Sequence, residues 1–184
     1  MPSPIAHSAS GYLLSRLPIA KNTLPGKVMT LTPITALYGI FVSNLPDLDF
    51  VPQVITGIRF HRGPSHSILA ALLVSALLTL IVHQVRRHAR YRSLFITTLG
   101  FYGVHIFMDL FTAGGSGLPL LWPLSDRTFR APFSIFPAVH HSRGLLDPSH
   151  FTFISIELLY IVAVFLAIGI IKSRWPQKTQ KKDL

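Results

Sequence analysis

The most informative absences in this sequence are those of cysteine and of acidic residues. There is no cysteine among the 184 residues, which excludes disulfides and thiolate metal ligands. Only seven residues are Asp or Glu, against 17 Lys and Arg, and charged residues make up 13% of the chain. Two of the seven acids nevertheless stand two positions apart, as Asp47 and Asp49 in "LPDLD". Such a pair at the end of an apolar stretch indicates a specific site.

Two common catalytic signatures are also missing. The chain has no glycine-rich phosphate loop of the Walker type and no GxSxG nucleophile elbow. The segment "TAGGSG" at residues 112–117 is rich in glycine, but it follows an apolar run. It is therefore interpreted as a re-entrant turn.

Long apolar runs are what the chain has instead, with a mean hydropathy of +0.47. Residues 151–171 form the clearest run, and about 20 apolar residues are enough for a helix to cross a bilayer. Residues 67–83, 93–111 and, more weakly, 30–45 predict further spans, while the N-terminal segment spans, re-enters or lies in the interface. The predicted fold is all-α: a polytopic helical bundle with four or five transmembrane segments and a re-entrant or interfacial loop region. Residues 1–177 form a single integral-membrane domain, and residues 178–184 form a polar cytoplasmic tail.

The distribution of basic residues gives this bundle an orientation. Lys and Arg are in excess in the cytoplasmic loops of membrane proteins. Placing residues 16–27, 86–92 and 172–182 in the cytoplasm puts twelve of the 17 Lys and Arg residues there. This arrangement explains the net charge of +10 without a nucleic-acid partner, and it predicts a cytoplasmic C-terminus.

The same orientation gathers acids and histidines on the outer side of the membrane. They come from distant parts of the chain and need not have shared a side. The residues predicted on that side include Asp47, Asp49, His61, His66, His105, Asp109 and Glu157, and His7 joins them if the first segment runs from outside to inside.

Two histidines flank a bend in "HRGPSHS", at His61 and His66. Gly63 and Pro64 bend the chain, and Ser65 is expected to cap the helix that His66 opens. Imidazoles on a loop and at the adjoining helix start can turn toward one ion. A helix cap with two solvated histidines is the alternative.

A second pair, His105 and Asp109 in "HIFMD", is spaced i, i+4 and shares one helical face. Ionisable side chains inside a span are costly and mark functional interiors. A buried His–Asp pair with a purely structural role is the alternative.

In "LPDLD", Pro46 is expected to end the preceding helix, after which Asp47 and Asp49 point the same way if the local geometry is strand-like. Two close carboxylates repel each other, and a divalent cation stabilises both as anions. Surface acids that face lipid headgroups are the alternative.

Nitrogen and oxygen ligands without sulfur favour Zn²⁺, with Mn²⁺ or Fe²⁺ as alternatives, and the number of candidates allows more than one ion. Asp49, Asp109 and Glu157 are the candidate proton acceptors; Glu157 could also be a ligand or a buried partner for an arginine. Arg62 and Arg130 are the candidates for binding an anionic substrate, with contact to lipid headgroups as the alternative.

Taken together, "LPDLD", "HRGPSHS", "HIFMDLFT" and "GLPLLWPLSDRTFRAPFS" resemble the LexA-regulated, inner-membrane metal-dependent hydrolase family, the YdjM-like proteins. The early "AHSASGYLL" resembles the N-terminal histidine segment of that family, and the resemblance covers about residues 7–134. It implies a bacterial inner-membrane protein. The metal-site candidates that it implies are His7, Asp47, Asp49, His61, His66, His105 and Asp109.

The expected function is a membrane-embedded metal-dependent hydrolase with its site on the periplasmic side. A site beside arginines at a membrane surface favours a lipid or another amphiphilic ester, most plausibly one bearing a phosphoester. Membrane lipids and a lipid-like substrate are the expected partners. A non-catalytic metal-binding protein or a metal-ion transporter is the alternative.

Overall fold

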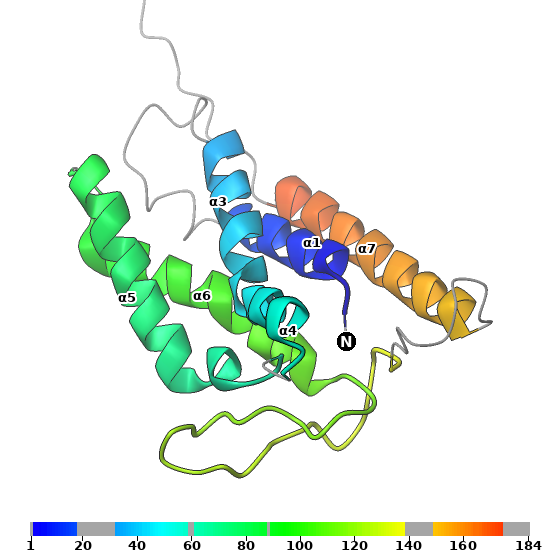
Figure 1. Cartoon of the computed structure of the whole chain (residues 1–184). Helices are drawn as coiled ribbons and strands as arrows, with labels where there is room; N and C mark the ends of the chain where they lie inside the picture. Colours follow the sequence, from blue (N-terminus) through cyan, green and yellow to red (C-terminus); the bar gives the residue numbers. More distant parts are fainter. Residues whose placement is uncertain (1, 18–31, 59–60, 88, 139–148, 175–184) are drawn as a thin grey trace, which may run out of the picture.

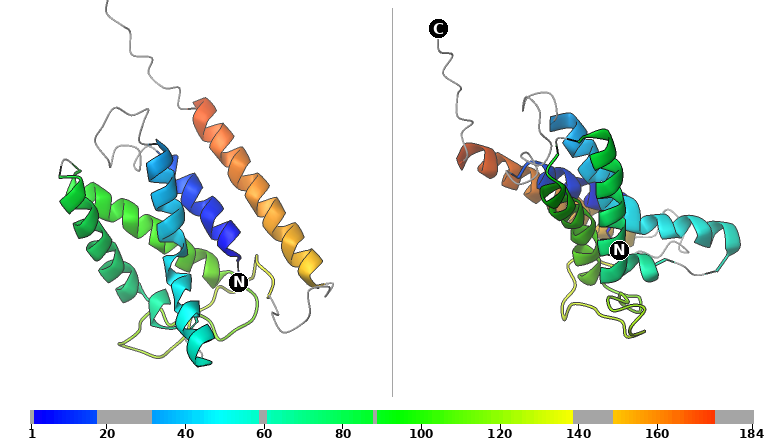
Figure 2. Two further views of the ribbon diagram at one scale, coloured as in Figure 1. Left: turned by 45° about the horizontal axis from the view of Figure 1, so that its top comes forward. Right: turned by 90° about the vertical axis from the view of Figure 1, so that its left-hand side faces the viewer.

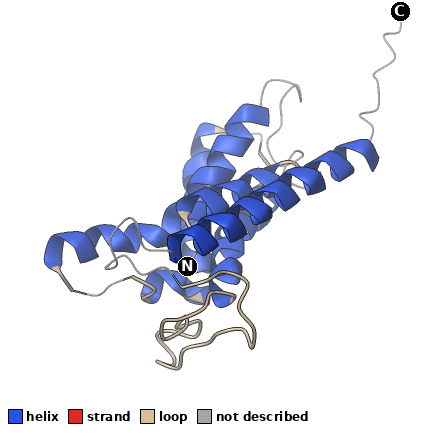
Figure 3. Cartoon of the chain, turned by 90° about the vertical axis from the view of Figure 1, so that its right-hand side faces the viewer, coloured by secondary structure: helices blue, strands red, loops and turns tan. Residues whose placement is uncertain are grey.

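The computed structural model describes residues 2–17, 32–58, 61–87, 89–138 and 149–174. Within these ranges every regular element is a helix, as Figure 3 shows, and extended chain is limited to two isolated bridges. The predicted all-α class is confirmed for this part of the chain. The predicted tail at residues 178–184 lies outside the described residues.

The described helices follow one another in chain order, and residues 111–138 contain no helix. In order they are α1 (Pro4–Ser15), α3 (Thr32–Asn44), the 3₁₀ helix η1 (Leu45–Asp49), α4 (Phe50–Thr56), the 3₁₀ helix η2 (Pro64–His66), α5 (Ile68–Val85), α6 (Tyr91–Leu110) and α7 (Ser149–Arg174).

Three of these helices are long and apolar enough to cross a membrane: α5, α6 and the stretch His150–Ile171 of α7. They agree with the spans predicted at residues 67–83, 93–111 and 151–171. The span predicted at residues 30–45 corresponds to α3 in the structure. Its 13 residues extend over about 20 Å, which is less than the roughly 30 Å thickness of the hydrocarbon core of a bilayer. Four or five spans are therefore not confirmed within the described residues.

Helix α1 lies at the centre of the packing, where it contacts α3, α6 and α7 (Figure 1). Helices α3 and α5 both pack on α6 as well. The main core cluster includes Val42 of α3, Ala71 of α5 and Phe101 and Ile106 of α6. In α5 and α7 only 17% of the apolar window is buried inside the protein, so the outer faces of both helices are suited to contact lipid.

Two glycines allow α1 and α3 to touch through their backbones. A Cβ atom at Gly11 would lie 2.5 Å from the carbonyl oxygen of Gly39, and one at Gly39 would lie 2.8 Å from that of Gly11. Small residues permit such close helix approach in membrane proteins. Across this contact the Ser43 hydroxyl donates a hydrogen bond to the backbone carbonyl of His7, at 3.0 Å. The glycine pair thus fixes His7 against the end of α3.

Candidate metal centre

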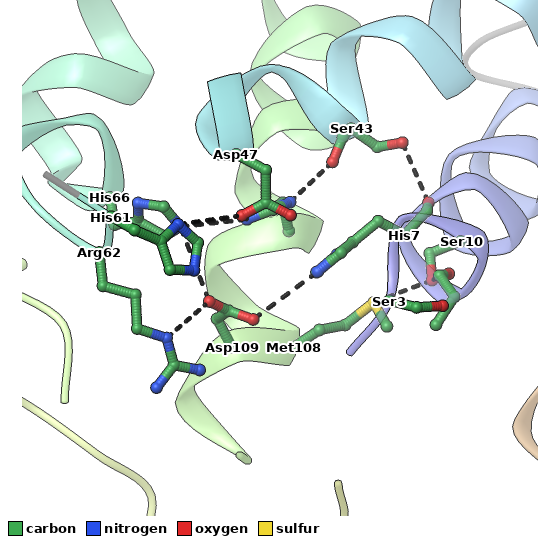
Figure 4. A network of polar contacts seen from close by, with 12 residues as sticks. Ser3, His7, Ser10, Ser43, Asp47, His61, Arg62, His66, Met108 and Asp109 are labelled. Atoms are coloured by element: carbon green, nitrogen blue, oxygen red, sulfur yellow. Dashed lines mark hydrogen bonds and ion pairs between the residues drawn. The ribbon is translucent and has the colours of Figure 1, made fainter. Parts of the chain in front are cut away.

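The seven predicted ligands converge at one end of the bundle, where η1, η2 and the end of α6 meet the first turn of α1. Figure 4 labels His7, Asp47, His61, His66 and Asp109 among them. They form three groups whose ligand atoms lie within 4.8 Å of one another. The groups are His7–His105–Asp109, Asp47–His66–His105 and Asp47–Asp49–His61.

Helix α6 supplies His105 and Asp109 on its buried face, as their i, i+4 spacing predicts. Both side chains are fully enclosed, with no more than 2% of either residue exposed. The Nδ1–H of His105 donates to the carbonyl oxygen of Ser43 at 2.8 Å. This bond fixes the tautomer and leaves the lone pair of Nε2 directed into the cluster, as in metal-ligating histidines.

The acidic pair lies on η1, so the strand-like geometry expected for this segment is wrong. Asn44 is the last residue of α3, and Leu45–Asp49 continue as a 3₁₀ turn with Pro46 in its first turn. In this tighter turn the two carboxylates have different nearest histidines, and both also lie beside His66, at 3.7 Å for Asp47 and 3.3 Å for Asp49. Asp47 Oδ1 lies 3.4 Å from His105 Nε2, whereas Asp49 Oδ1 lies 2.8 Å from His61 Nδ1.

The "HRGPSHS" segment brings its two histidines to the same carboxylate, Asp49. The Ser65 hydroxyl donates to Asp49 Oδ2 and lies 2.9 Å from His66 Nδ1. Ser65 is therefore not the cap of α5, as predicted; Ser67 is, and its hydroxyl accepts from the N–H of Ala70. With Nδ1 of His66 facing Ser65, its Nε2 faces the cluster.

The Asp47–His66–His105 group has the dimensions of a metal site. The two Nε2 atoms lie 3.2 Å apart, and Asp47 Oδ1 lies 3.4 Å from His105 Nε2 and 3.7 Å from His66 Nε2. Tetrahedral ligands of Zn²⁺ at bond lengths near 2.1 Å are separated by about 3.4 Å. Because two imidazole lone pairs repel each other, a proton or a cation is needed between these nitrogens.

His7 completes the cluster from α1. Its ring stacks on that of His105 with centroids 3.7 Å apart, and its Nε2 lies 3.6 Å from Asp109 Oδ1. Neither ring nitrogen of His7 has a hydrogen-bond partner, although the residue is fully buried. Both oxygens of Asp47 and Oδ1 of Asp109 are also buried without one. Buried polar atoms without partners are costly, and a bound cation would satisfy the carboxylate of Asp47 and one ring nitrogen of His7.

The carboxylates outside the spans are held as anions. Burial works against ionisation of Asp47, but the imidazoles of His105 and His66 outweigh it and keep the pKa of Asp47 below its ordinary value. For Asp49, burial is likewise outweighed, by His61, His66 and Ser65, and its pKa is also lowered. The cluster therefore offers ionised oxygen ligands as well as imidazole nitrogens. That donor set fits a divalent ion such as Zn²⁺, Mn²⁺ or Fe²⁺.

The other predicted site residues have different positions. Arg62 is at the cluster, where its Nε donates to Asp109 Oδ2 at 3.2 Å. Arg130 is exposed, and no contact joins it to the cluster in the described part of the chain. Glu157 is buried on α7 but belongs to none of the three groups; its two carboxylate oxygens accept from the backbone N–H and the hydroxyl of Ser3, the N-cap of α1.

Several supporting residues were not identified from the sequence. Ser43 orients both His7 and His105 through its hydroxyl and its carbonyl, and Gln53 accepts from the backbone N–H of His61 at 3.0 Å. Tyr102 donates to the carbonyl of Ser65 at 2.7 Å. The position of Ser43, just before "NLPDLD", is a signal for a residue near the site, but its backbone contacts depend on the packing of α3 against α1 and α6.

The fold and the site define a helical membrane protein with a buried His/Asp cluster at one end of its bundle. The chain belongs to the YdjM inner membrane protein family, whose model matches residues 1–176. The family resemblance of the motifs is thereby confirmed. The inner membrane protein YbcI of Escherichia coli (strain K12) is 31% identical over 139 residues, which cover 73% of this chain and 75% of that protein. No solved structure matches the chain.

Proposed function

We propose that this protein is a metal-dependent hydrolase of the inner membrane that cleaves an ester bond in a lipid-like substrate. The observation that supports this most directly is the convergence of seven His and Asp side chains in a space where a structural core would hold apolar ones. A bound divalent ion would lower the pKa of a water molecule toward neutrality and polarise the ester.

Three carboxylates were predicted as proton acceptors, and the hydrogen bonds that each already accepts distinguish them. Glu157 is bound to Ser3, and Asp49 already accepts from His61, Ser65 and the backbone N–H of Arg62. Asp109 has one oxygen, Oδ1, without a hydrogen bond. We therefore assign the transfer of the proton from water to Asp109, with Arg62 keeping that carboxylate in place at its other oxygen.

The surroundings of the cluster favour an amphiphilic substrate. Helix α4 begins directly after Asp49 and buries none of its residues; it projects from the bundle in the right-hand view of Figure 2. Its Phe50, Val51, Val54 and Ile55 are each at least 45% exposed. A short helix with so much exposed apolar surface is suited to lie in the interface of a membrane. Acyl chains could reach the cluster along it without entering water.

The orientation we propose places the cluster on the periplasmic side. Arg86, Arg87, Arg90 and Arg92 lie around the connection of α5 and α6, at the end of α5 opposite to η2. The positive-inside rule then assigns that end to the cytoplasm. A cytoplasmic C-terminus follows if α7 also spans, and α1 with α3 would enter the membrane as a closely packed pair.

The test is hydrolysis by the purified full-length protein in detergent, with and without divalent metal, on lipid esters. We expect activity that requires metal and falls at least a hundredfold in His66→Ala. His83→Ala is the matched control, because His83 lies on the last turn of α5, far along the helix from the cluster. Equal activity in His66→Ala after chelation would exclude this function.

A metal-ion transporter is the second candidate, because two buried hydroxyls on α5, Ser75 Oγ and Thr79 Oγ1, have no hydrogen-bond partner. They lie one and two turns beyond Ala71 on the buried face of the helix. Two hydroxyls are weak ligands for a divalent ion, so we rank this function lower. Metal flux through proteoliposomes that is lost in Thr79→Val would reverse the ranking.

A further inference from the structure

Arg62 presents a second, unused face beyond the cluster. Its Nε is engaged by Asp109, but its Nη2 is buried and has no hydrogen-bond partner. A guanidinium has five N–H donors, and leaving a buried charged donor unpaired is costly. Figure 4 shows the terminal nitrogens of Arg62 pointing away from the histidines, past Asp109. The arginine is therefore arranged to accept a further anionic partner beside the metal centre.

A glycine-rich turn closes the other side of this guanidinium. Gly114, Gly115 and Gly117 all have left-handed φ angles, between 72° and 87°. A Cβ atom at Gly115 would lie 3.0 Å from Nη1 of Arg62, so the glycine lets the backbone approach the guanidinium. The backbone N–H groups of residues 114–116 donate to no acceptor in the described part of the chain. Free N–H groups on such turns are suited to bind anions.

The charge balance makes this pocket depend on the metal. Asp47, Asp49 and Asp109 outnumber the single guanidinium of Arg62, so the cluster repels anions while it lacks a cation. One divalent ion balances that excess, and a second makes the site positive. A planar guanidinium can donate two parallel hydrogen bonds to phosphoryl oxygens, and a divalent ion beside it adds further positive charge.

We propose that Arg62 and the turn at residues 114–117, here called the glycine turn, form a pocket for the phosphoryl oxygens of the substrate. The substrate class is then a phosphate ester, such as a phosphorylated lipid headgroup, and not a carboxylic ester. In hydrolysis Asp109 takes a proton from the water as the water oxygen bonds to phosphorus. The bond from phosphorus to the alcohol oxygen breaks, and Asp109 gives the proton to the leaving alcohol. This proposal rests on the proposed function only for that reaction; the binding of phosphate does not require it.

Binding is tested first, with inorganic phosphate and the purified full-length protein in detergent by calorimetry. We expect binding to the zinc-loaded protein and none after chelation. In Arg62→Met, measured at a zinc concentration that saturates the variant, we expect phosphate binding to be about tenfold or more weaker. Saturation is needed because loss of the partner of Asp109 also lowers the affinity for zinc. Arg62→Lys should recover part of the affinity. The matched control is Arg127→Met, because Arg127 is exposed and its guanidinium faces Phe129. Wild-type affinity in Arg62→Met would overturn the pocket.

The glycine turn is tested by a matched pair of alanine substitutions. Gly115→Ala adds a methyl group against Arg62 Nη1 at a φ of 72°, whereas Gly57→Ala imposes the same strain at a φ of 70° with nothing within 4 Å. We expect phosphate binding to weaken in Gly115→Ala alone, with zinc content unchanged in both. Equal loss in both variants, or in neither, would remove the glycine turn from the pocket.

Catalysis then separates the two proposals. p-Nitrophenyl phosphate and p-nitrophenyl butyrate share a leaving group, and we expect turnover of the phosphate alone. Arg62-dependent phosphate binding without turnover of either compound would leave the pocket standing and refute the hydrolase. Turnover of the butyrate without phosphate binding would do the reverse. Short-chain phosphatidic acid that binds more tightly than inorganic phosphate would assign the anion to a lipid headgroup; equal affinity would assign it to free phosphate.

Discussion

Substitution of Gly11 by alanine tests whether the contact between α1 and α3 is what brings His7 to the candidate metal centre. The added Cβ would lie 2.5 Å from the Gly39 carbonyl oxygen and from the Ser43 hydroxyl oxygen. An ordinary contact begins at 3.4 Å, so the helices must separate by about 0.9 Å. The Gly39 carbonyl is part of a helix backbone and cannot rotate away as a flexible side chain could.

The separation should remove His7 from the ion. His7 lies one turn before Gly11 on the same face of α1, so it moves with the helix. Metal sites tolerate errors of only about 0.2 Å in ligand distance, several times less than the required movement. Since loss of an outer partner of a ligand already weakens metal binding about tenfold to a hundredfold, we expect at least that effect here.

The assay is metal content of purified protein in detergent by mass spectrometry, with chelator competition to give affinity. His7→Ala provides the value for complete loss of this ligand. Gly100→Ala is the matched control, because a Cβ at that helical glycine of α6 meets nothing within 4 Å. Helical content and a single elution peak establish that each variant is folded. Wild-type affinity in folded Gly11→Ala, together with weak binding in His7→Ala, would refute the reasoning.

Three further predictions concern pH, the ligand hierarchy and α7. Burial lowers the pKa of His66, but Asp47 and Asp49 outweigh burial and raise the pKa to about 9. The proton of His66 therefore stabilises the metal-free fold fully below about pH 6.5, and this stability is lost as the pH rises through 9. Because metal must displace that proton, affinity should rise up to about tenfold per pH unit between pH 7 and 9; a flat titration profile would contradict this. His105→Ala should remove more metal per protein than His61→Ala, since His105 belongs to two ligand groups and His61 to one; equal losses would mean that the cluster acts as a single centre. Glu157→Gln weakens the hydrogen bonds to Ser3 and should lower the free energy of unfolding by about 1 to 3 kcal/mol without loss of metal. Loss of metal in this variant would show that Glu157 does belong to the metal centre.

The membrane helices and the candidate ligands could be predicted because each depends on local pattern. An uninterrupted apolar run such as residues 151–171 forms a helix in lipid regardless of its neighbours, and the i, i+4 spacing of His105 and Asp109 places both on one face. The motif segments could likewise be assigned to a family, because they occur along this chain in the same order as in that family. The cap of α5 was placed two residues too early because Ser65 and Ser67 are equally good caps locally, and the contact of Ser65 with Asp49 decided between them.

By itself the sequence determined which side chains were available for a metal centre, because scarce acids and histidines in an apolar chain are costly unless used together. Only the tertiary structure decided how they meet. The 3₁₀ turn of η1 places Asp47 nearest to His105 and Asp49 nearest to His61, and the contact of Gly11 with Gly39 brings His7 onto His105. The partner of Glu157 also depends on tertiary packing. Its hydrogen bond to Ser3 forms because α7 packs on α1, and this contact joins residues 154 positions apart, which no local pattern encodes.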